Sequence, residues 1–162
     1  MGTNAHGVLS WDLSEVATAL KLSPEEVREY FTDGRRVSFL LERRIAKEVI
    51  KGRLAPSEGS GYDLIAPDGG KWEVRSISKG GIYFCPSYMV GSGRAFNAKG
   101  FTSKLKEIQG YIVSDIEKFP QIPYWVVNKM VVIEWYRKNL LGSGTKTSRI
   151  RILDLLEKML NM

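Results

Sequence analysis

Two carboxylates and two cations lie close together in the stretch GYDLIAPDGGKWEVRSIS. Asp63 precedes a Pro-Asp-Gly-Gly turn, whereas Glu73 and Arg75 follow the turn two residues apart. Successive side chains of a strand point to opposite faces, so Lys71, Glu73 and Arg75 are expected on one face of the strand after the turn. If the turn returns that strand to Asp63, the two carboxylates meet and can bind a hard divalent cation such as Mg²⁺. An ordinary surface hairpin with cross-strand ion pairs explains the same residues.

Composition narrows the chemistry that such a site can perform. The chain has 162 residues, a formal net charge of +6 and one histidine, His6, close to its first residue. Histidine-based metal sites and Ser-His-Asp catalysis are therefore disfavoured, and the basic charge favours a polyanionic partner. The single cysteine, Cys85, cannot form an internal disulfide. No apolar run reaches the length of a signal peptide or a membrane span, which predicts a soluble, cytoplasmic protein.

The elements that must position the site begin with two short helices in DLSEVATALKLSPEEVREYF. Asp12 or Ser14 is expected to cap the first helix, and Ser23, followed by proline and two glutamates, is a start signal for the second. The spacing resembles a helix-turn-helix, although many such units have glycine where Lys21 stands. In that interpretation Arg28 on the second helix contacts DNA. A plain helical hairpin packed on the core is the alternative.

A longer helix is expected in RRVSFLLERRIAKEVIKGRL. Val37, Leu41 and Ile45 form an apolar stripe at four-residue spacing. Gly52 marks the expected end of the helix. Glu42 lies at the edge of the apolar stripe, so it can reach a site on the adjoining sheet.

The segment after the hairpin combines a short strand around residues 82–85 with an irregular, glycine-rich loop. Three donors for phosphates and base edges and one ring for stacking are candidates for DNA binding: Arg94, Asn97, Lys99 and Tyr88. An ordinary flexible surface loop is the alternative for each of them.

Three further elements are expected towards the C-terminus. Apolar residues at three- and four-residue spacing predict an amphipathic helix over residues 101–119, with Lys104 and Lys106 on its polar face. The stretch IPYWVVNKMVVIEWYRK is interpreted as two strands with a turn near Asn128, and a last helix follows the basic link GSGTKTSRIR. Together the elements predict an α/β domain with a mixed central β-sheet flanked by helices.

The hairpin and its surroundings resemble the PD-(D/E)xK nuclease superfamily, and within it the small type II restriction endonucleases. In that motif an Asp ends one strand and an E-x-K tripeptide lies on the next strand. Asp63 and Glu73 match the two acids, and Arg75 stands where lysine is usual. Glu42 matches a further glutamate that the preceding helix often contributes. The likeness in the order of helix, hairpin, strand, helix and strand covers roughly residues 36 to 137.

The resemblance implies a restriction-endonuclease-like nuclease core over residues 36–162, preceded by a helix-turn-helix-like element over residues 1–35. It implies Mg²⁺, with Mn²⁺ as a substitute, held by Asp63, Glu73 and the backbone carbonyl of Val74. It also implies sequence-specific cleavage of double-stranded DNA by a homodimer, because a two-fold dimer meets a palindromic site. The alternatives are a junction-resolving or repair nuclease of the same superfamily and a non-catalytic helix-turn-helix DNA-binding regulator.

Arg75 is the departure from the family pattern that bears most on activity. Arginine stabilises negative charge but is effectively never deprotonated, so it cannot be a general base. Three hypotheses follow for the role of Arg75. It acts as a purely electrostatic group, or Lys71 on the same face takes the place of the usual lysine, or the site is catalytically degenerate. We favour an active metal-dependent nuclease.

Overall fold

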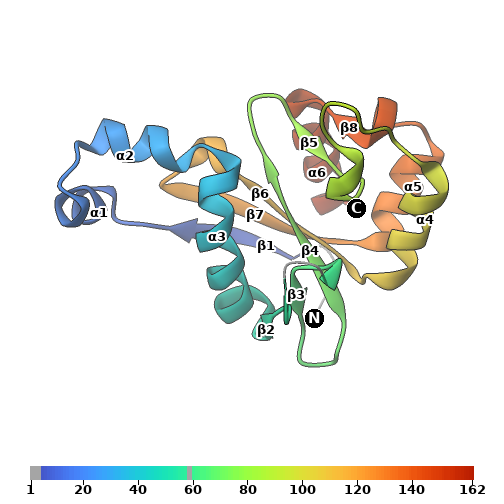
Figure 1. The fold of residues 1–162 in the computed structure, drawn as a ribbon, viewed down its shortest axis with the longest axis horizontal. Helices are drawn as coiled ribbons and strands as arrows, with labels where there is room; N and C mark the ends of the chain where they lie inside the picture. The colour runs from blue at the N-terminus through green and yellow to red at the C-terminus, as the bar shows by residue number, and fades with distance from the viewer. Residues whose placement is uncertain (1–4, 58–59) are drawn as a thin grey trace.

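A six-stranded mixed sheet forms the centre of the protein (Figure 1). The computed structural model describes residues 5–57 and 60–162, apart from the side chains at positions 34 and 35. The strand order is β1-β7-β6-β4-β3-β2; β4 and β6 are parallel, whereas the other neighbouring pairs are antiparallel. The strands are β1 (His6–Ser10), β2 (Arg53–Leu54), β3 (Leu64–Ile65), β4 (Lys71–Ile77), β6 (Gly110–Asp115) and β7 (Gln121–Asn128).

Helices flank the sheet in two groups, as Figure 1 shows. The first group is α1 (Leu13–Leu20), α2 (Pro24–Phe31) and α3 (Gly34–Arg44), which continues as the π-helical turn η1 (Ile45–Ile50). The second group is α4 (Ala98–Glu107), α5 (Lys129–Arg137) and α6 (Arg149–Leu160). The predicted α/β architecture with a mixed central sheet and flanking helices is therefore confirmed.

The two faces of β4 bury different side chains. Trp72 and Val74 pack in the same cluster as Leu41 of α3, whereas Ile77 packs in the cluster that contains Phe101 of α4. Because side chains alternate along a strand, the odd-numbered polar residues of β4 share the face of Ile77 and are directed towards α4. Glu73 and Arg75 therefore lie on the face of β4 that α4 covers.

The capping residues predicted for the two N-terminal helices are confirmed. Asp12 accepts the backbone N–H of Glu15 at the start of α1, and Ser23 and Glu26 form a capping box at the start of α2. Lys21, between the helices, has φ 59°. Glycine adopts this left-handed conformation more readily than lysine.

The N-terminal helices are part of the same packed body as the sheet. Ala17 of α1 and Val27 of α2 are buried in the cluster that contains Leu41 and Trp72. The strand β1, which the sequence analysis did not predict, pairs with β7 along its whole length, beginning at His6 opposite Trp125. Residues on both sides of position 35 therefore contribute to one hydrophobic cluster.

Two predicted elements are wrong. The helix expected over residues 101–119 ends at Glu107, and residues 110–115 form β6, whose every residue is buried. Both faces of β6 are covered, and Ile112 lies four residues from Ile108 and from Ile116, so the apolar spacing of this strand matched that of a helix.

The second of the two strands expected in residues 122–138 is the helix α5, capped by Asn128. Its valines and isoleucine have strand propensity, but the cap and the packing of the helix on β6 and β7 override that preference.

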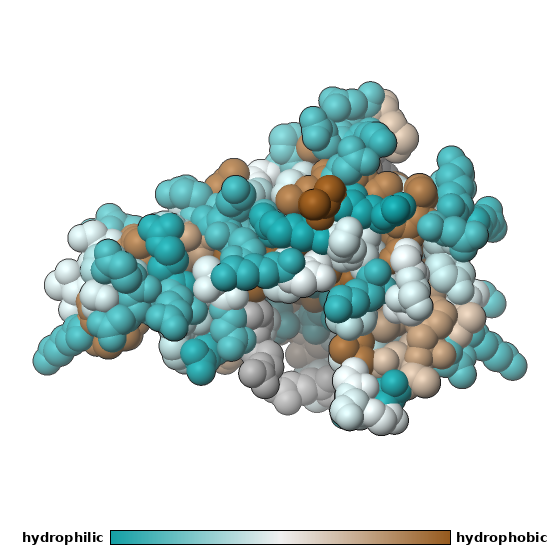
Figure 2. Space-filling view, turned by 90° about the horizontal axis from the view of Figure 1, so that it is seen from above, coloured by the Kyte–Doolittle hydropathy of each residue, from teal (hydrophilic) through white to brown (hydrophobic). Residues whose placement is uncertain are grey.

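A second, two-stranded sheet lies beside α6. It pairs β5 (Ile82–Tyr83) with β8 (Lys146–Thr147). Short 3₁₀ turns complete the fold: η3 (Ser87–Met89), η4 (Ile116–Lys118) and η5 (Ser143–Thr145). Across residues 5–57 and 60–162, no helix has the length and apolarity needed to cross a membrane. The face seen in Figure 2 is largely hydrophilic, with hydrophobic side chains in small groups.

Candidate active site

The hairpin of β3 and β4 brings the two predicted carboxylates together. Leu64 pairs with Trp72 in antiparallel register, so the residue before Leu64 lies opposite the residue after Trp72. These residues are Asp63 and Glu73. Their backbones are locked by the N–H of Asp63, which donates to the carbonyl of Trp72 at 3.0 Å. Asp63 Oδ2 in turn accepts the backbone N–H of Val74 at 2.8 Å.

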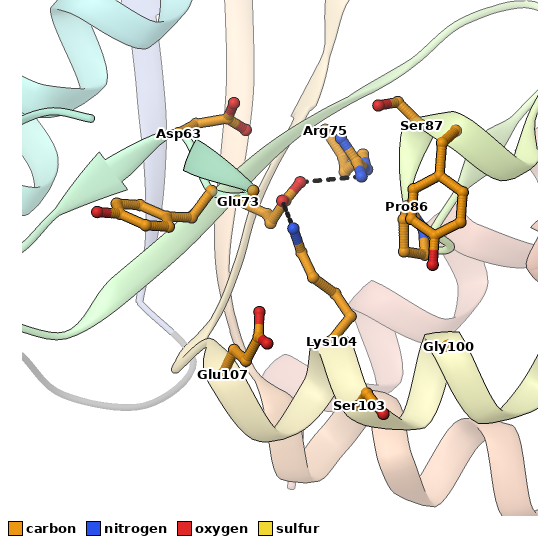
Figure 3. A pocket seen from close by; sticks show the side chains of 12 residues that line it. Asp63, Glu73, Arg75, Pro86, Ser87, Gly100, Ser103, Lys104 and Glu107 are labelled. Atoms are coloured by element: carbon orange, nitrogen blue, oxygen red, sulfur yellow. Dashed lines mark ion pairs between the residues drawn. The ribbon is translucent and has the colours of Figure 1, made fainter. Parts of the chain in front are cut away.

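Glu73 is a buried carboxylate, 4% exposed, that two cations neutralise. Arg75 Nη2 lies 2.9 Å from Glu73 Oε2, and the ammonium of Lys104 forms an ion pair with Glu73 Oε1 (Figure 3). Burying a carboxylate is costly unless it is paired and hydrogen-bonded, so these two contacts explain how Glu73 is accommodated inside the protein.

Lys104 reaches Glu73 from α4, the helix that connects β5 to β6. It is only 9% exposed, and Phe101 and Leu105 on the same helix are buried. The prediction that Lys104 belongs to a polar face is therefore wrong: it lies on the buried stripe. The sequence signal that could have identified it is its position three residues after Phe101, because a lysine within an apolar stripe needs a buried partner.

The ion pair of Glu73 and Lys104 lines a cavity of about 340 Å³ between the hairpin, α4 and η3. Asp63, Glu73, Arg75 and Lys104 converge on it in Figure 3. Its other lining residues are Gly61, Tyr62, Pro86, Ser87, Tyr88, Gly100, Ser103 and Glu107. A Cβ at Gly100 would lie 2.8 Å from the hydroxyl of Tyr88, so glycine lets η3 pack closely against α4 at the edge of the cavity.

The electrostatics of Asp63 favour a cation at this point. Burial raises the pKa of Asp63, and the negative charge of Glu73 raises it further. The hydrogen bond from Val74 and the charges of Arg75 and Lys104 act in the opposite direction without cancelling the increase. The ionised Asp63 is therefore short of positive charge, which a divalent cation can supply.

The available donors fit Mg²⁺. The backbone N–H of Val74 faces Asp63. The N–H and the C=O of one strand residue point to the same neighbouring strand, so the carbonyl of Val74 is also directed towards the strand that carries Asp63. Within the described part of the chain, His, Cys, Asp and Glu side chains form no group of three or more suited to a metal. Two carboxylates and one carbonyl nevertheless suffice, because Mg²⁺ keeps several waters and binds substrate phosphates. Glu73 can retain both ion pairs, since a carboxylate offers about four lone-pair positions.

Arg75 is positioned as a fixed charge. Its Nη2 also donates to the carbonyl of Cys85 at 3.2 Å, which ties β4 to the segment before η3. Its Nε is buried, without a hydrogen-bond partner among the described residues. The guanidinium lines the cavity and is held there by these contacts.

The two other predicted catalytic residues lie in different places. Glu42 on α3 is half-buried and lines two cavities that also include Asp63, so the structure brings it to the edge of the site. Lys71 is exposed, and its ammonium lies 4.9 Å from the centre of the Tyr62 ring. The lysine that contacts Glu73 is therefore Lys104, whereas Lys71 stands over Tyr62 at the start of β4.

The predicted DNA contacts are divided between two regions. Tyr88 is 63% exposed and lines the cavity, and Lys99 is exposed on the first turn of α4. Asn97 caps α4 by accepting the N–H of Gly100, and Arg94 donates to two backbone carbonyls of the same loop, at 3.3 Å each. Arg28 is exposed on α2, which lies at the opposite end of the protein from α4 in Figure 1.

Comparison with known proteins finds no relative. No family model, curated protein or solved structure matches the chain. The chemistry of Asp63, Glu73, Arg75 and Lys104 is therefore the basis for a functional proposal.

Proposed function

We propose that the protein is a Mg²⁺-dependent endonuclease that hydrolyses phosphodiester bonds of double-stranded DNA. The observation that carries this proposal is the convergence of Asp63, Glu73 and Lys104 in one cavity. Two carboxylates beside a backbone carbonyl suit a metal ion, and a lysine at the same point suits the handling of water and developing charge. The formal charge of +6 on the chain suits a polyanionic substrate.

The order of elements around the site also supports the proposal. The helix α3 is followed by the antiparallel strands β2, β3 and β4, then by α4, which crosses over to the parallel strand β6. The resemblance to PD-(D/E)xK nucleases implies this order of helix, hairpin, strand, helix and strand. This order of elements supports the proposal.

In this proposal Asp63, Glu73 and the carbonyl of Val74 hold Mg²⁺. When bound, Mg²⁺ polarises the phosphate, lowers the pKa of water and neutralises charge that develops on oxygen. Asp63 and Glu73 would hold the cation in the cavity that they line, and with it the phosphate that the cation binds. Glu42, at the edge of the site, adds negative charge on the α3 side.

The motif lysine is expected to orient or activate water and to stabilise negative charge, and in this proposal Lys104 and Arg75 share these two functions. Hydrolysis adds water across a P–O bond, so a proton must leave the attacking water and another must reach the leaving oxygen. Lys104, as an ammonium, can orient the water and donate a proton to the leaving oxygen, while the proton of the attacking water passes to solvent. Arg75 can only donate hydrogen bonds and stabilise negative charge. We assign the proton-handling role to Lys104 and the electrostatic role to Arg75.

The finer features of the substrate follow from the resemblance. Sequence-specific cleavage by a homodimer is the form of activity that we propose, because a two-fold dimer presents two sites to the two strands of a palindrome. Mn²⁺ is expected to replace Mg²⁺, since it accepts the same oxygen donors.

The test is cleavage of plasmid and phage DNA with Mg²⁺, with Mn²⁺ and with EDTA, using the wild type, Glu73→Gln and the exposed control Glu157→Gln. We expect discrete fragments from the wild type and the control in either metal, and none from Glu73→Gln or in EDTA. Cleavage of four-way junctions but not of linear duplex would favour a junction-resolving nuclease. Retention of DNA without cleavage in any metal would favour the non-catalytic regulator.

A further inference from the structure

A second cavity of about 660 Å³ adjoins the proposed active site. Asp63, Arg75 and Ser87 line both cavities, so the two spaces meet at the reaction centre. The second cavity extends from there to Tyr83 and Lys146 on the small β5-β8 sheet. Its volume is sufficient for a nucleotide, because protein sites for small ligands measure about 300–1,000 Å³.

Tyr83 and Lys146 form a preassembled pair at the far end of this cavity. They are direct cross-strand partners, and the Lys146 ammonium lies 5.6 Å from the centre of the Tyr83 ring. Their neighbours, Ile82 and Thr147, are buried, and Thr147 Oγ1 donates to the carbonyl of Leu141 at 2.8 Å. The small sheet is thus anchored to the core through alternate residues, while Tyr83 and Lys146 remain exposed.

The turn before β5 lets the chain lie close to the cavity. Gly81 has φ 105°, and a Cβ there would lie 2.0 Å from the carbonyl oxygen of Thr147. A side chain at this position would therefore force the two strands apart. The adjacent wall carries Ser78, whose hydroxyl donates to the carbonyl of Gly81 at 3.3 Å and keeps the capacity to accept a hydrogen bond from a ligand.

Charge is distributed unevenly along the cavity. The acidic residues Asp33, Glu42 and Asp63 line the side of α3 and the reaction centre. Arg75 supplies a cation at the reaction centre, and Lys146 supplies one on the β5-β8 side. An ammonium binds phosphate, and an aromatic ring binds the face of a base or a sugar. A nucleotide offers both groups at the spacing of one monomer, unlike an inorganic anion or an apolar ligand.

We propose that the second cavity is a subsite for a nucleotide next to the cleaved phosphodiester, with Lys146 binding its phosphate and Tyr83 packing against its sugar. This inference rests on the proposed nuclease function, because it places the substrate strand across the point where the two cavities meet. It assigns to the β5-β8 sheet the task of holding the strand on one side of the reaction centre.

Binding of a fluorescein-labelled DNA duplex in EDTA, followed by anisotropy at several salt concentrations, tests the subsite. Lys146→Ala is expected to weaken binding about 5- to 10-fold and to reduce the magnitude of the slope of log K against log salt by about 0.9, since one phosphate contact is lost. Tyr83→Ala is expected to weaken binding at least about 5-fold, whereas Tyr83→Phe, which keeps the ring, should bind as the wild type does. Lys158→Ala, on the exposed part of α6, is the matched cation control. Thermal unfolding checks that each variant is folded.

Cleavage kinetics in Mg²⁺ separate the subsite from the proposed reaction. If the subsite exists, Lys146→Ala raises KM and leaves kcat unchanged at saturating DNA. If Lys146→Ala and Tyr83→Ala both keep the affinity, salt slope and KM of the wild type, the subsite proposal is overturned. The nuclease proposal is unaffected by that result. If the wild type binds DNA but never cleaves it, and both variants bind DNA more weakly, the nucleotide subsite is supported and the nuclease proposal is overturned. A wild type that neither binds nor cleaves DNA would overturn both.

Discussion

The ammonium of Lys104 on α4 lies against the buried carboxylate of Glu73 on β4. This ion pair joins the crossover helix to the central strand at the position where the proposed chemistry takes place. Arg75 pairs with the other oxygen of the same carboxylate. The site therefore contains a lysine and an arginine, supplied by two different elements.

Lys104→Ala should abolish most of the DNA cleavage. Loss of a group that transfers protons costs about 10²- to 10⁴-fold in rate, and Glu73 would also lose one of its two partners. The rate of Mg²⁺-dependent plasmid cleavage measures the effect, with Lys106→Ala as the control on the exposed side of the same helix. Equal activity of the two variants would show that Lys104 only stabilises the fold.

Arg75→Lys distinguishes an active site from a degenerate one. If Lys104 already supplies the lysine, we expect this change to alter the cleavage rate by less than about 10-fold. A lysine at position 75 should also partly restore cleavage to Lys104→Ala, because it offers the same ammonium to Glu73 from the strand. A large gain of activity in Arg75→Lys alone would instead indicate that the natural site is impaired.

Asp63→Asn should stabilise the metal-free protein at neutral pH. The raised pKa of Asp63 means that the folded state binds a proton more tightly than the unfolded state, so stability falls as pH rises from about 3.8 through the raised pKa. The amide removes this ionisation and can still accept the N–H of Val74. We expect a higher Tm, by about 2–4 °C for each kcal/mol gained. Mg²⁺ should raise the Tm of the wild type but not of the variant; the reverse pattern would argue against a metal at Asp63.

Cleavage should weaken at mildly acidic pH and should recover with more Mg²⁺. Burial and Glu73 raise the pKa of Asp63, so protonation begins at a higher pH than for an ordinary aspartate. Protons and the metal compete for the ionised carboxylate, and a higher Mg²⁺ concentration should move the acidic limb of the pH–rate profile to lower pH. An acidic limb that does not respond to Mg²⁺ would mean that a group other than a metal ligand controls it.

Arg149→Ala should destabilise the fold. Nη1 and Nη2 of Arg149 each lie 2.7 Å from an oxygen of the carboxylate of Asp115, which is 1% exposed. Removing one partner of a buried ion pair leaves an uncompensated charge and costs roughly 3 kcal/mol. Urea unfolding measures this loss against Lys158→Ala, whose exposed pair with Asp154 is expected to contribute less than about 0.5 kcal/mol. Similar losses in both variants would contradict the structural role of Arg149.

Local signals in the sequence were sufficient for the hairpin and the N-terminal caps. The turn residues and the alternation around Glu73 predicted which side chains share a face, because strand geometry has a period of two. The caps at Asp12 and Ser23 were equally predictable, because capping depends on contacts within one turn of helix. The end of α4 and the nature of α5 were not, because apolar periodicity cannot distinguish a fully buried strand from a helix.

By itself, the sequence determined that Asp63 and Glu73 can meet on one face of a hairpin beside Arg75. Only the tertiary structure decided which lysine joins them. Lys104 is remote from Glu73 along the chain, and its approach depends on how α4 packs on the sheet through Phe101 and Leu105. A contact of this kind is created by packing between elements, whereas propensity and alternation describe only neighbours in the chain.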